Sequence, residues 1–142
     1  MLKVLLPVDG SECSDRAVDF VIEKMRAGEG EIELHLLTVH TPIPYASAVS
    51  VIGSNKVEQY YHEEGNVTLK SARARLDAAK VAYTHHIIVG DPAEVIVRFA
   101  KEITADQIII GTHGRGVIGT MLMGSVASKV SDLAEVPVQL VK

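Results

Sequence analysis

A glycine-rich segment that follows the apolar run Gln107–Ile110 is the part of this sequence best suited to chemistry. It runs from Gly111 to Gly124 and is followed directly by Ser125. Glycine lets a ligand approach the main chain closely, and backbone amides at the start of a helix favour an anion. The Ser125 hydroxyl and the Arg115 guanidinium would add further donors. The order strand, glycine loop, helix start favours phosphate binding over a flexible connection without a ligand.

The familiar nucleotide motifs do not describe this loop. A Walker loop would end on Gly-Lys-Ser or Gly-Lys-Thr, and a dinucleotide fingerprint would place G-x-G-x-x-G after the first strand; the sequence has neither. Ser125 has no obvious base and no Gly-x-Ser-x-Gly elbow. Fast phosphoryl transfer needs a metal, a positioned nucleophile and charge on the leaving oxygens. We therefore predict no catalytic residue and, at most, slow hydrolysis.

The histidines do not form a pattern that predicts a metal site. His85 and His86 are adjacent, so on a strand they would face opposite sides. His62 is followed by two glutamates without the H-E-x-x-H spacing of zinc hydrolases, which indicates a solvated helix face. His40 follows the second predicted strand and is within reach of a ligand there, but we expect a surface histidine.

Five short apolar runs, typical of strands buried in a parallel sheet, alternate with segments of helical periodicity. The predicted strands are Val4–Val8, Ile32–Val39, Tyr83–Val89, Gln107–Ile110 and Pro137–Val141. The alternation predicts right-handed crossovers and an α/β fold, with helices on both faces of an open parallel sheet. Without an internal repeat or linker, residues 1–142 are expected to form one domain.

The helices carry recognisable start and stop signals. Ser14 is the predicted N-cap of the first helix, and Asp91, followed by proline, is that of the third. The second helix, Lys56–Lys80, contains Gly65, which predicts a kink or a late start. The segment Tyr45–Gly53 has no clean periodicity and is predicted to be a loop.

The carboxyl ends of the strands are the expected ligand positions. In open sheets of this kind, ligands sit beyond those ends, near the switch in strand order. The rule selects the residues after Val8, Val39 and Ile110. Asp9, directly after the first strand, has two possible roles: it caps the following turn, or it contacts a ribose or a metal ion. We favour the second role.

Composition excludes several other functions. The net charge of -4 at pH 7 argues against a broad nucleic-acid surface, and 4% aromatic residues without tryptophan argue against a base-stacking platform. No stretch approaches the roughly 20 apolar residues of a membrane span. Cys13 is the only cysteine, so no intrachain disulfide can form. We expect a soluble, cytoplasmic protein that neither binds nucleic acid nor inserts into a membrane.

The glycine loop resembles the ATP-binding pattern of the universal stress protein family. The match is Gly111-x2-Gly114-x9-Gly124-Ser125, and it fixes three glycines and a hydroxyl residue across a long gap. The likeness extends to the opening strand and turn, to Gly90-Asp91-Pro92, and to the terminal strand.

The resemblance implies an open five-stranded sheet of the Rossmann-like, adenine nucleotide alpha hydrolase-like type. It also implies an adenine nucleotide, ATP or AMP or a relative, across the first, second and fourth strand ends, with Mg²⁺ or Mn²⁺ as the candidate metal ions. Asp9 would lie near the ribose or the metal. Carried over to this sequence, the nucleotide-binding residues are Pro7, Val8, Asp9, Val39, Gly111, Gly114, Gly124, Ser125 and Val126, with His113 and Arg115 as further candidates inside the variable gaps.

The resemblance further implies a homodimer. The C-terminal strand, Val136–Val141, lies at a sheet edge in the implied strand order, and an open apolar edge is a template for pairing. Three functions stay open: a nucleotide-binding regulatory protein of the stress response, which we favour; a slow ATPase or phosphotransferase; and a ligand-free dimeric scaffold. The sequence does not distinguish ATP from AMP or a cyclic nucleotide.

Overall fold

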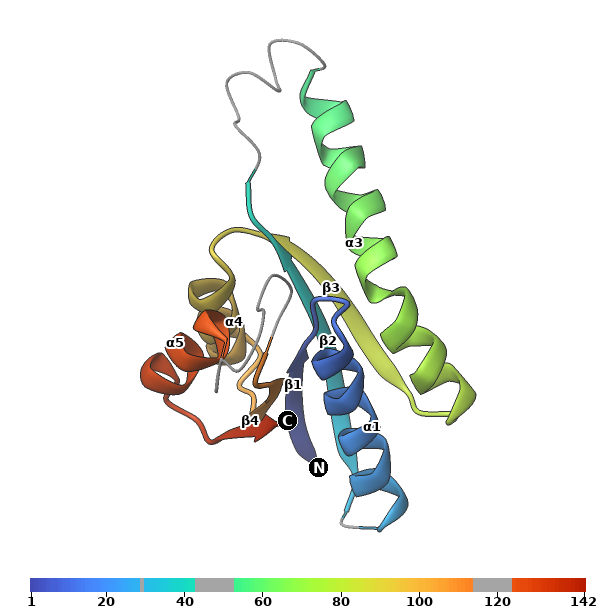
Figure 1. Ribbon diagram of the computed structural model, residues 1–142. Helices are drawn as coiled ribbons and strands as arrows, with labels where there is room; N and C mark the ends of the chain where they lie inside the picture. The colour runs from blue at the N-terminus through green and yellow to red at the C-terminus, as the bar shows by residue number, and fades with distance from the viewer. Residues whose placement is uncertain (29, 43–52, 114–123) are drawn as a thin grey trace.

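A computed structural model describes residues 1–28, 30–42, 53–113 and 124–142 of the chain (Figure 1). Most of the predicted loop Tyr45–Gly53 lies outside the described residues. The same holds for Gly114 and Arg115, two candidates for phosphate binding.

A five-stranded parallel sheet with the order β3-β2-β1-β4-β5 forms the centre of the fold. Its strands are β1 (Leu2–Pro7), β2 (Ile32–His40), β3 (Tyr83–Val89), β4 (Gln107–Gly111) and β5 (Val138–Val141). The central strands β1 and β4 are buried on both faces, which explains their continuous apolar runs. The predicted sheet is confirmed, with strand ends that differ by one or two residues.

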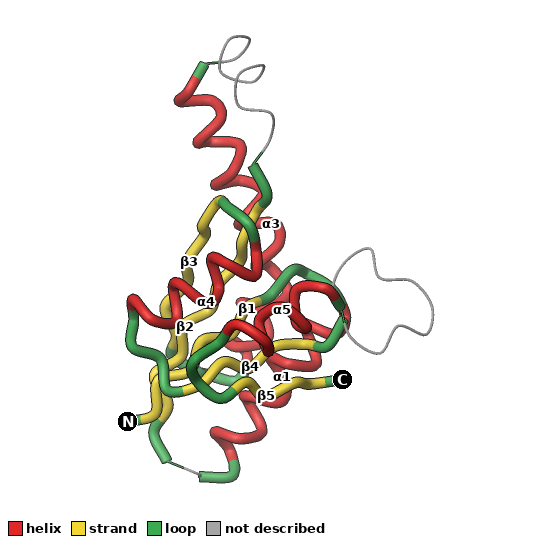
Figure 2. Tube along the Cα trace, turned by 90° about the vertical axis from the view of Figure 1, so that its left-hand side faces the viewer, coloured by secondary structure: helices red, strands yellow, loops and turns green. Residues whose placement is uncertain are grey.

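Helices cover both faces of the sheet, as predicted. In Figure 1, α1 (Glu12–Arg26) and α3 (Ser54–Ala78) lie to the right of the strands, and α4 (Pro92–Glu102) and α5 (Ser125–Leu133) lie to the left. Figure 2 views the molecule from the side of α4 and α5. The sheet therefore separates two apolar cores, one beneath each helix pair. No helix within the described ranges is long and apolar enough to cross a membrane.

The cap of α1 differs from the prediction. Ser11, not Ser14, is the N-cap, and its hydroxyl accepts a hydrogen bond of 3.2 Å from the Ser14 amide. Ser14 lies inside the first turn and is buried, with its hydroxyl directed to Asp9. At α4 the prediction is confirmed, because Asp91 accepts from the Glu94 amide and Pro92 begins the helix.

Gly65 neither kinks α3 nor delays its start, contrary to the prediction. The helix is continuous from Ser54 to Ala78, and its N-terminal half projects beyond the strands (Figures 1 and 2). A Cβ atom added at Gly65 would lie 2.5 Å from Cγ2 of Ile87 on β3. The glycine therefore lets the helix approach the strand closely, an effect that local propensity does not contain.

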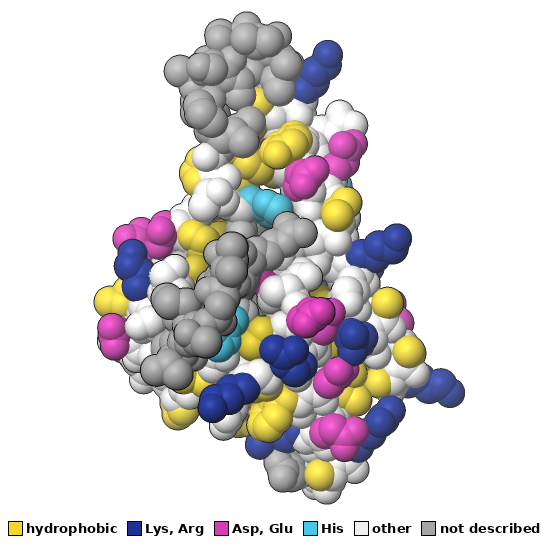
Figure 3. All heavy atoms as spheres, viewed as in Figure 1, with side chains coloured by type: hydrophobic (Ala, Val, Ile, Leu, Met, Phe, Trp, Pro, Cys, Tyr) yellow, Lys and Arg dark blue, Asp and Glu magenta, His cyan; other side chains and the backbone are white. Residues whose placement is uncertain are grey.

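Acidic and basic side chains lie next to one another on the outer face of α1 and α3 (Figure 3). Arg75 pairs with Asp19 at 2.8 Å and with Asp15 at 3.8 Å, and the Ser71 hydroxyl donates to Asp15 at 2.9 Å. Asp15 and Asp19 of α1 thus connect α1 to α3 through these polar contacts. His62 is exposed, as predicted for a solvated helix face.

Candidate functional site

The carboxyl ends of β2, β1 and β4 meet at one edge of the sheet, because these strands are consecutive in the strand order. A cavity of about 180 Å³ lies there, and the start of α5 forms part of its lining. It is lined by Pro7, Val8, Asp9, Ser14, Leu37, Val39, Pro92, Ile110, Gly111, Thr112, His113, Gly124, Ser125, Val126 and Ala127. The three strand ends selected from the sequence therefore meet in one place.

One wall of the cavity is apolar. Val8, Leu37 and Ile110 are nearly fully buried, and Val39 extends this surface to the end of β2. Leu37 and Val39 point to the same side because side chains alternate along a strand. A flat, weakly polar ring is the kind of ligand group that such a wall accommodates.

Asp9 contributes the only carboxylate among the described residues of the cavity wall. Its Oδ1 atom accepts hydrogen bonds from the Ser11 amide at 3.0 Å and from the Ser14 hydroxyl at 2.9 Å. The described part of the chain holds no group of three or more histidine, cysteine or acidic residues suited to a metal ion. A Mg²⁺ ion bound here would need oxygen ligands from the phosphates of a nucleotide, the usual arrangement for this metal.

The end of β4 packs tightly against the first turn of α1. A Cβ atom added at Gly111 would lie 2.9 Å from the carbonyl carbon and oxygen of Cys13. The Cys13 thiol is buried and donates to the Val141 carbonyl at 3.2 Å. Burial raises the pKa of Cys13, but hydrogen bonds from the His113 amide and from Thr112 outweigh burial, so the pKa lies below its ordinary value.

The start of α5 supplies backbone amides to the cavity. Gly124 is the N-cap residue, in extended conformation, and no side chain of the described residues caps the helix. The Gly124 amide itself donates to the Thr112 carbonyl, which ties the helix start to the end of β4. The amides of the first turn, with the exposed Ser125 hydroxyl beside them, carry the partial positive charge of the helix N-terminus.

Every predicted binding residue within the described ranges lines this cavity. Sequence reasoning missed six lining residues, which are Ser14, Leu37, Pro92, Ile110, Thr112 and Ala127. Strand alternation from Val39 would have found Leu37. His40, expected at the surface, is half-buried, and its buried Nε2 atom has no hydrogen-bond partner within the described ranges.

Comparison with known proteins gives a consistent set of relatives. A family model described as the universal stress protein family matches residues 1–142. Universal stress protein MJ0531 of Methanocaldococcus jannaschii is 31% identical over 140 residues, which are 99% of this chain and 81% of that protein. The solved structure of MJ0577, from the same organism, matches with a TM-score of 0.82 at 28% identity, over 99% of this chain and 95% of the other.

Two other solved structures are complexes with a nucleotide. A universal stress protein in complex with cAMP matches with a TM-score of 0.70 at 27% identity, over 99% of this chain and 97% of the other. The universal stress protein of Archaeoglobus fulgidus in complex with dAMP matches with a TM-score of 0.69 at 25% identity, over 100% and 98%.

Proposed function

The chain belongs to the universal stress protein family, and from this premise we propose that it binds an adenine nucleotide, ATP or a close relative, in the cavity at the carboxyl edge of the sheet. It acts there as a regulatory module with little or no turnover. The proposal depends on one observation above all: three strand ends and the start of α5 line the same cavity.

Two parts of the cavity lining suit the two parts of a nucleotide. The apolar wall of Val8, Leu37, Val39 and Ile110 suits the adenine ring. The uncapped first turn of α5, with the Ser125 hydroxyl, suits the phosphates. Complexes of structural relatives with cAMP and dAMP support the adenine moiety. Asp9, whose carboxylate lines the same cavity, would contact the ribose or a phosphate-bound Mg²⁺ or Mn²⁺ ion.

Low turnover follows from the groups that surround the cavity. Among the described lining residues, Asp9 and His113 carry the ionisable side chains. The Asp9 carboxylate accepts two hydrogen bonds from the first turn of α1, and the His113 ring is hydrogen-bonded to Thr112 at 2.9 Å. We expect turnover far below the ~1–100 s⁻¹ of kinases.

The open edge of β5 supports a homodimer as the assembled form. The Pro137 carbonyl accepts from the Ile108 amide of β4, and the Val141 carbonyl accepts from the amide of Thr112, directly after β4, at 2.9 Å each. Because backbone groups of successive residues point to alternate sides of a strand, Val138 and Leu140 direct theirs to the open edge. A second copy related by a two-fold axis would pair with these groups.

Calorimetric titration with ATP, AMP and cAMP tests nucleotide binding. Gly124 has dihedral angles that valine adopts without strain (φ -68°, ψ 155°), so Gly124→Val should keep the fold while it fills the approach to the helix start. Ser128→Val, on the exposed face of the same helix, is the matched control. We expect binding in the wild type and the control, and weakened binding in Gly124→Val. Absence of heat with all three nucleotides in the wild type would refute the proposal.

A further inference from the structure

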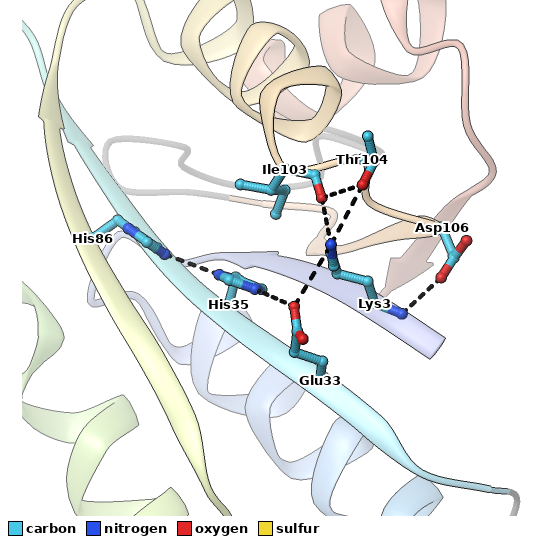
Figure 4. A network of polar contacts seen from close by, with 7 residues as sticks. All are labelled: Lys3, Glu33, His35, His86, Ile103, Thr104 and Asp106. Atoms are coloured by element: carbon cyan, nitrogen blue, oxygen red, sulfur yellow. Dashed lines mark hydrogen bonds and ion pairs between the residues drawn. The ribbon is translucent and has the colours of Figure 1, made fainter. Parts of the chain in front are cut away.

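Two histidines from neighbouring strands are hydrogen-bonded to each other on the sheet face that α4 covers (Figure 4). His35 on β2 and His86 on β3 have Nδ1 and Nε2 atoms, respectively, 3.0 Å apart. The other nitrogen of His35, Nε2, lies 2.8 Å from Oε2 of Glu33. Phe99 of α4 rests on the His86 ring, with centroids 4.6 Å apart. Glu33, His35 and His86 thus form a continuous hydrogen-bonded chain. It runs from the half-exposed Glu33 carboxylate to the side of α4 that faces the sheet.

The imidazole rings meet edge to edge. Their planes differ by 16° and their centroids are 5.2 Å apart, whereas the facing nitrogens are only 3.0 Å apart. Rings stacked face on face would not bring two nitrogens so much closer than the ring centres. The contact is therefore an N–H···N hydrogen bond in the plane of the rings, which requires one proton between the two nitrogens.

This requirement limits the number of protons that the pair can hold. In the neutral state, His35 donates from Nε2 to Glu33 and accepts at Nδ1 from His86. One additional proton, on Nδ1 of His86, leaves the shared hydrogen bond intact, and its charge can move to His35 beside Glu33. A second additional proton would place two N–H groups against each other across 3.0 Å. The pair accepts one proton and excludes the next.

The charged and titratable groups around the His35–His86 pair also bear on how many protons it can hold. From β1, the Lys3 ammonium reaches Glu33 at 3.7 Å and so opposes further positive charge. On β3, His85 is the exposed neighbour of His86 on the opposite face. The charged residues of α4 near Phe99 are exposed and pair outward, Arg98 with Glu102 and Lys101 with Glu135. The hydrogen bond from His35 is the main cause that lowers the pKa of Glu33. Burial, then the charges of His35 and His85, lowers the pKa of His86.

The pair also adjoins the cavity. Leu37, which lines the cavity, is two residues from His35 on β2 and is the register partner of His86 on β3. Pro92, the first residue of α4, lines the cavity as well. A rearrangement between α4 and the His35–His86 pair would therefore displace two parts of the cavity wall.

We propose that His35 and His86 form an acid-operated latch, which holds α4 on the sheet at neutral pH and loosens both α4 and the cavity wall when a second proton enters the pair. The consequence for the cavity rests on the nucleotide binding proposed above; the latch itself does not. Because the second proton breaks the shared hydrogen bond, the loosening of α4 grows as the pH falls through the depressed pKa of His86.

The first test measures the latch without a nucleotide. We would follow the ring nitrogens of His35 and His86 by NMR between about pH 8 and 4, together with hydrogen exchange of the α4 amides. His86→Gln keeps an amide donor toward His35 but cannot be protonated, and His85→Gln is the matched control. We expect coupled two-step titration in the wild type and the control, and a single titration step in His86→Gln. Protection of the α4 amides, corrected for the intrinsic pH dependence of exchange, should fall at the lower step of the wild type. Independent titration of the two rings in the wild type would overturn the proposal.

The second test measures ATP affinity over the same pH range by calorimetry. The ratio of wild-type to His86→Gln affinity removes the titration of the phosphates from the comparison. We expect this ratio to fall by about tenfold for each pH unit below the depressed pKa, the limit for one linked proton. A constant ratio, with binding present at neutral pH, would overturn the link to the cavity. Absence of binding at neutral pH would contradict the proposed function and leave the NMR result to decide the latch.

Discussion

Asp9 and Ser14 hold each other through two reciprocal hydrogen bonds. The Asp9 amide donates to the Ser14 hydroxyl at 2.9 Å, and that hydroxyl donates to the Asp9 carboxylate at 2.9 Å. The Ser11 amide adds a third bond, to the same carboxylate oxygen, at 3.0 Å. The turn between β1 and α1 therefore fixes the direction of the carboxylate before a ligand arrives. A preorganised group costs less conformational entropy on binding.

Ser14→Ala should weaken nucleotide binding through its effect on Asp9. The substitution removes a hydrogen bond to a charged acceptor, worth about 1.5–3 kcal/mol, and part of that loss falls on the preorganisation of Asp9. We expect a decrease in affinity of about tenfold, measured by calorimetry with ATP. Ser128→Ala, at an exposed position of α5, controls for the loss of a hydroxyl. Equal affinities in the two variants would contradict a positioning role for Ser14.

Asp9→Asn should abolish the metal-dependent part of ATP binding and spare much of the rest. Asparagine retains an acceptor oxygen for Ser11 and Ser14 but lacks the charge that favours Mg²⁺ or Mn²⁺. The measurement is the ratio of ATP affinity with Mg²⁺ to that with a chelator, compared between wild type and variant. We expect the ratio to exceed one in the wild type and to approach one in Asp9→Asn. If both proteins give the same ratio, the metal does not bind at Asp9.

The general position of the site could be read from the sequence because it depends on local signals. Continuous apolar runs such as Val4–Val8 identify buried parallel strands, and the carboxyl ends of such strands are where ligands bind. The glycine loop begins at Gly111 for a similar reason, since the backbone there comes close to the first turn of α1. The resemblance to a family added the strand order, which the runs alone do not determine.

Features that depend on contacts across the fold could not be read in this way. Ser11 and Ser14 are equally good caps by residue type, and only the position of Asp9 separates them. The pairing of His35 with His86 depends on the register between β2 and β3, which no local pattern fixes.

Gly65→Ala should destabilise the protein although alanine is the better helix former. Propensity favours alanine over glycine by about 1 kcal/mol in a helix interior. The added methyl group would, however, lie 2.5 Å from Cγ2 of Ile87, and overpacking of a core costs about 1–3 kcal/mol. We expect a lower free energy of unfolding in urea for Gly65→Ala than for the wild type.

A double-mutant cycle separates the two contributions. Ile87→Ala removes all three atoms that the new methyl group would meet, so Gly65→Ala should become stabilising by about 1 kcal/mol in that background. Val67→Ala, at an exposed position of α3, reports the propensity effect without the contact. If Gly65→Ala has the same sign with Ile87 and with Ala at position 87, close approach is not the reason for the glycine.

Val138→Pro should convert the proposed dimer to a monomer while the sheet within each chain stays intact. The Pro137 and Val141 carbonyls accept at 2.9 Å each from Ile108 of β4 and from Thr112 directly after it. The backbone of Val138, between them, points to the other edge of β5, so proline removes an outward donor and no bond to β4. Gln139→Ala, which keeps every backbone donor and changes an exposed side chain, is the control. Light scattering coupled to size exclusion should give twice the chain mass of 15.3 kDa for the wild type and the control, and the chain mass for Val138→Pro.

A wild-type mass near 15.3 kDa at micromolar concentration would reject the dimer. A proline variant that keeps the doubled mass would place the interface away from β5.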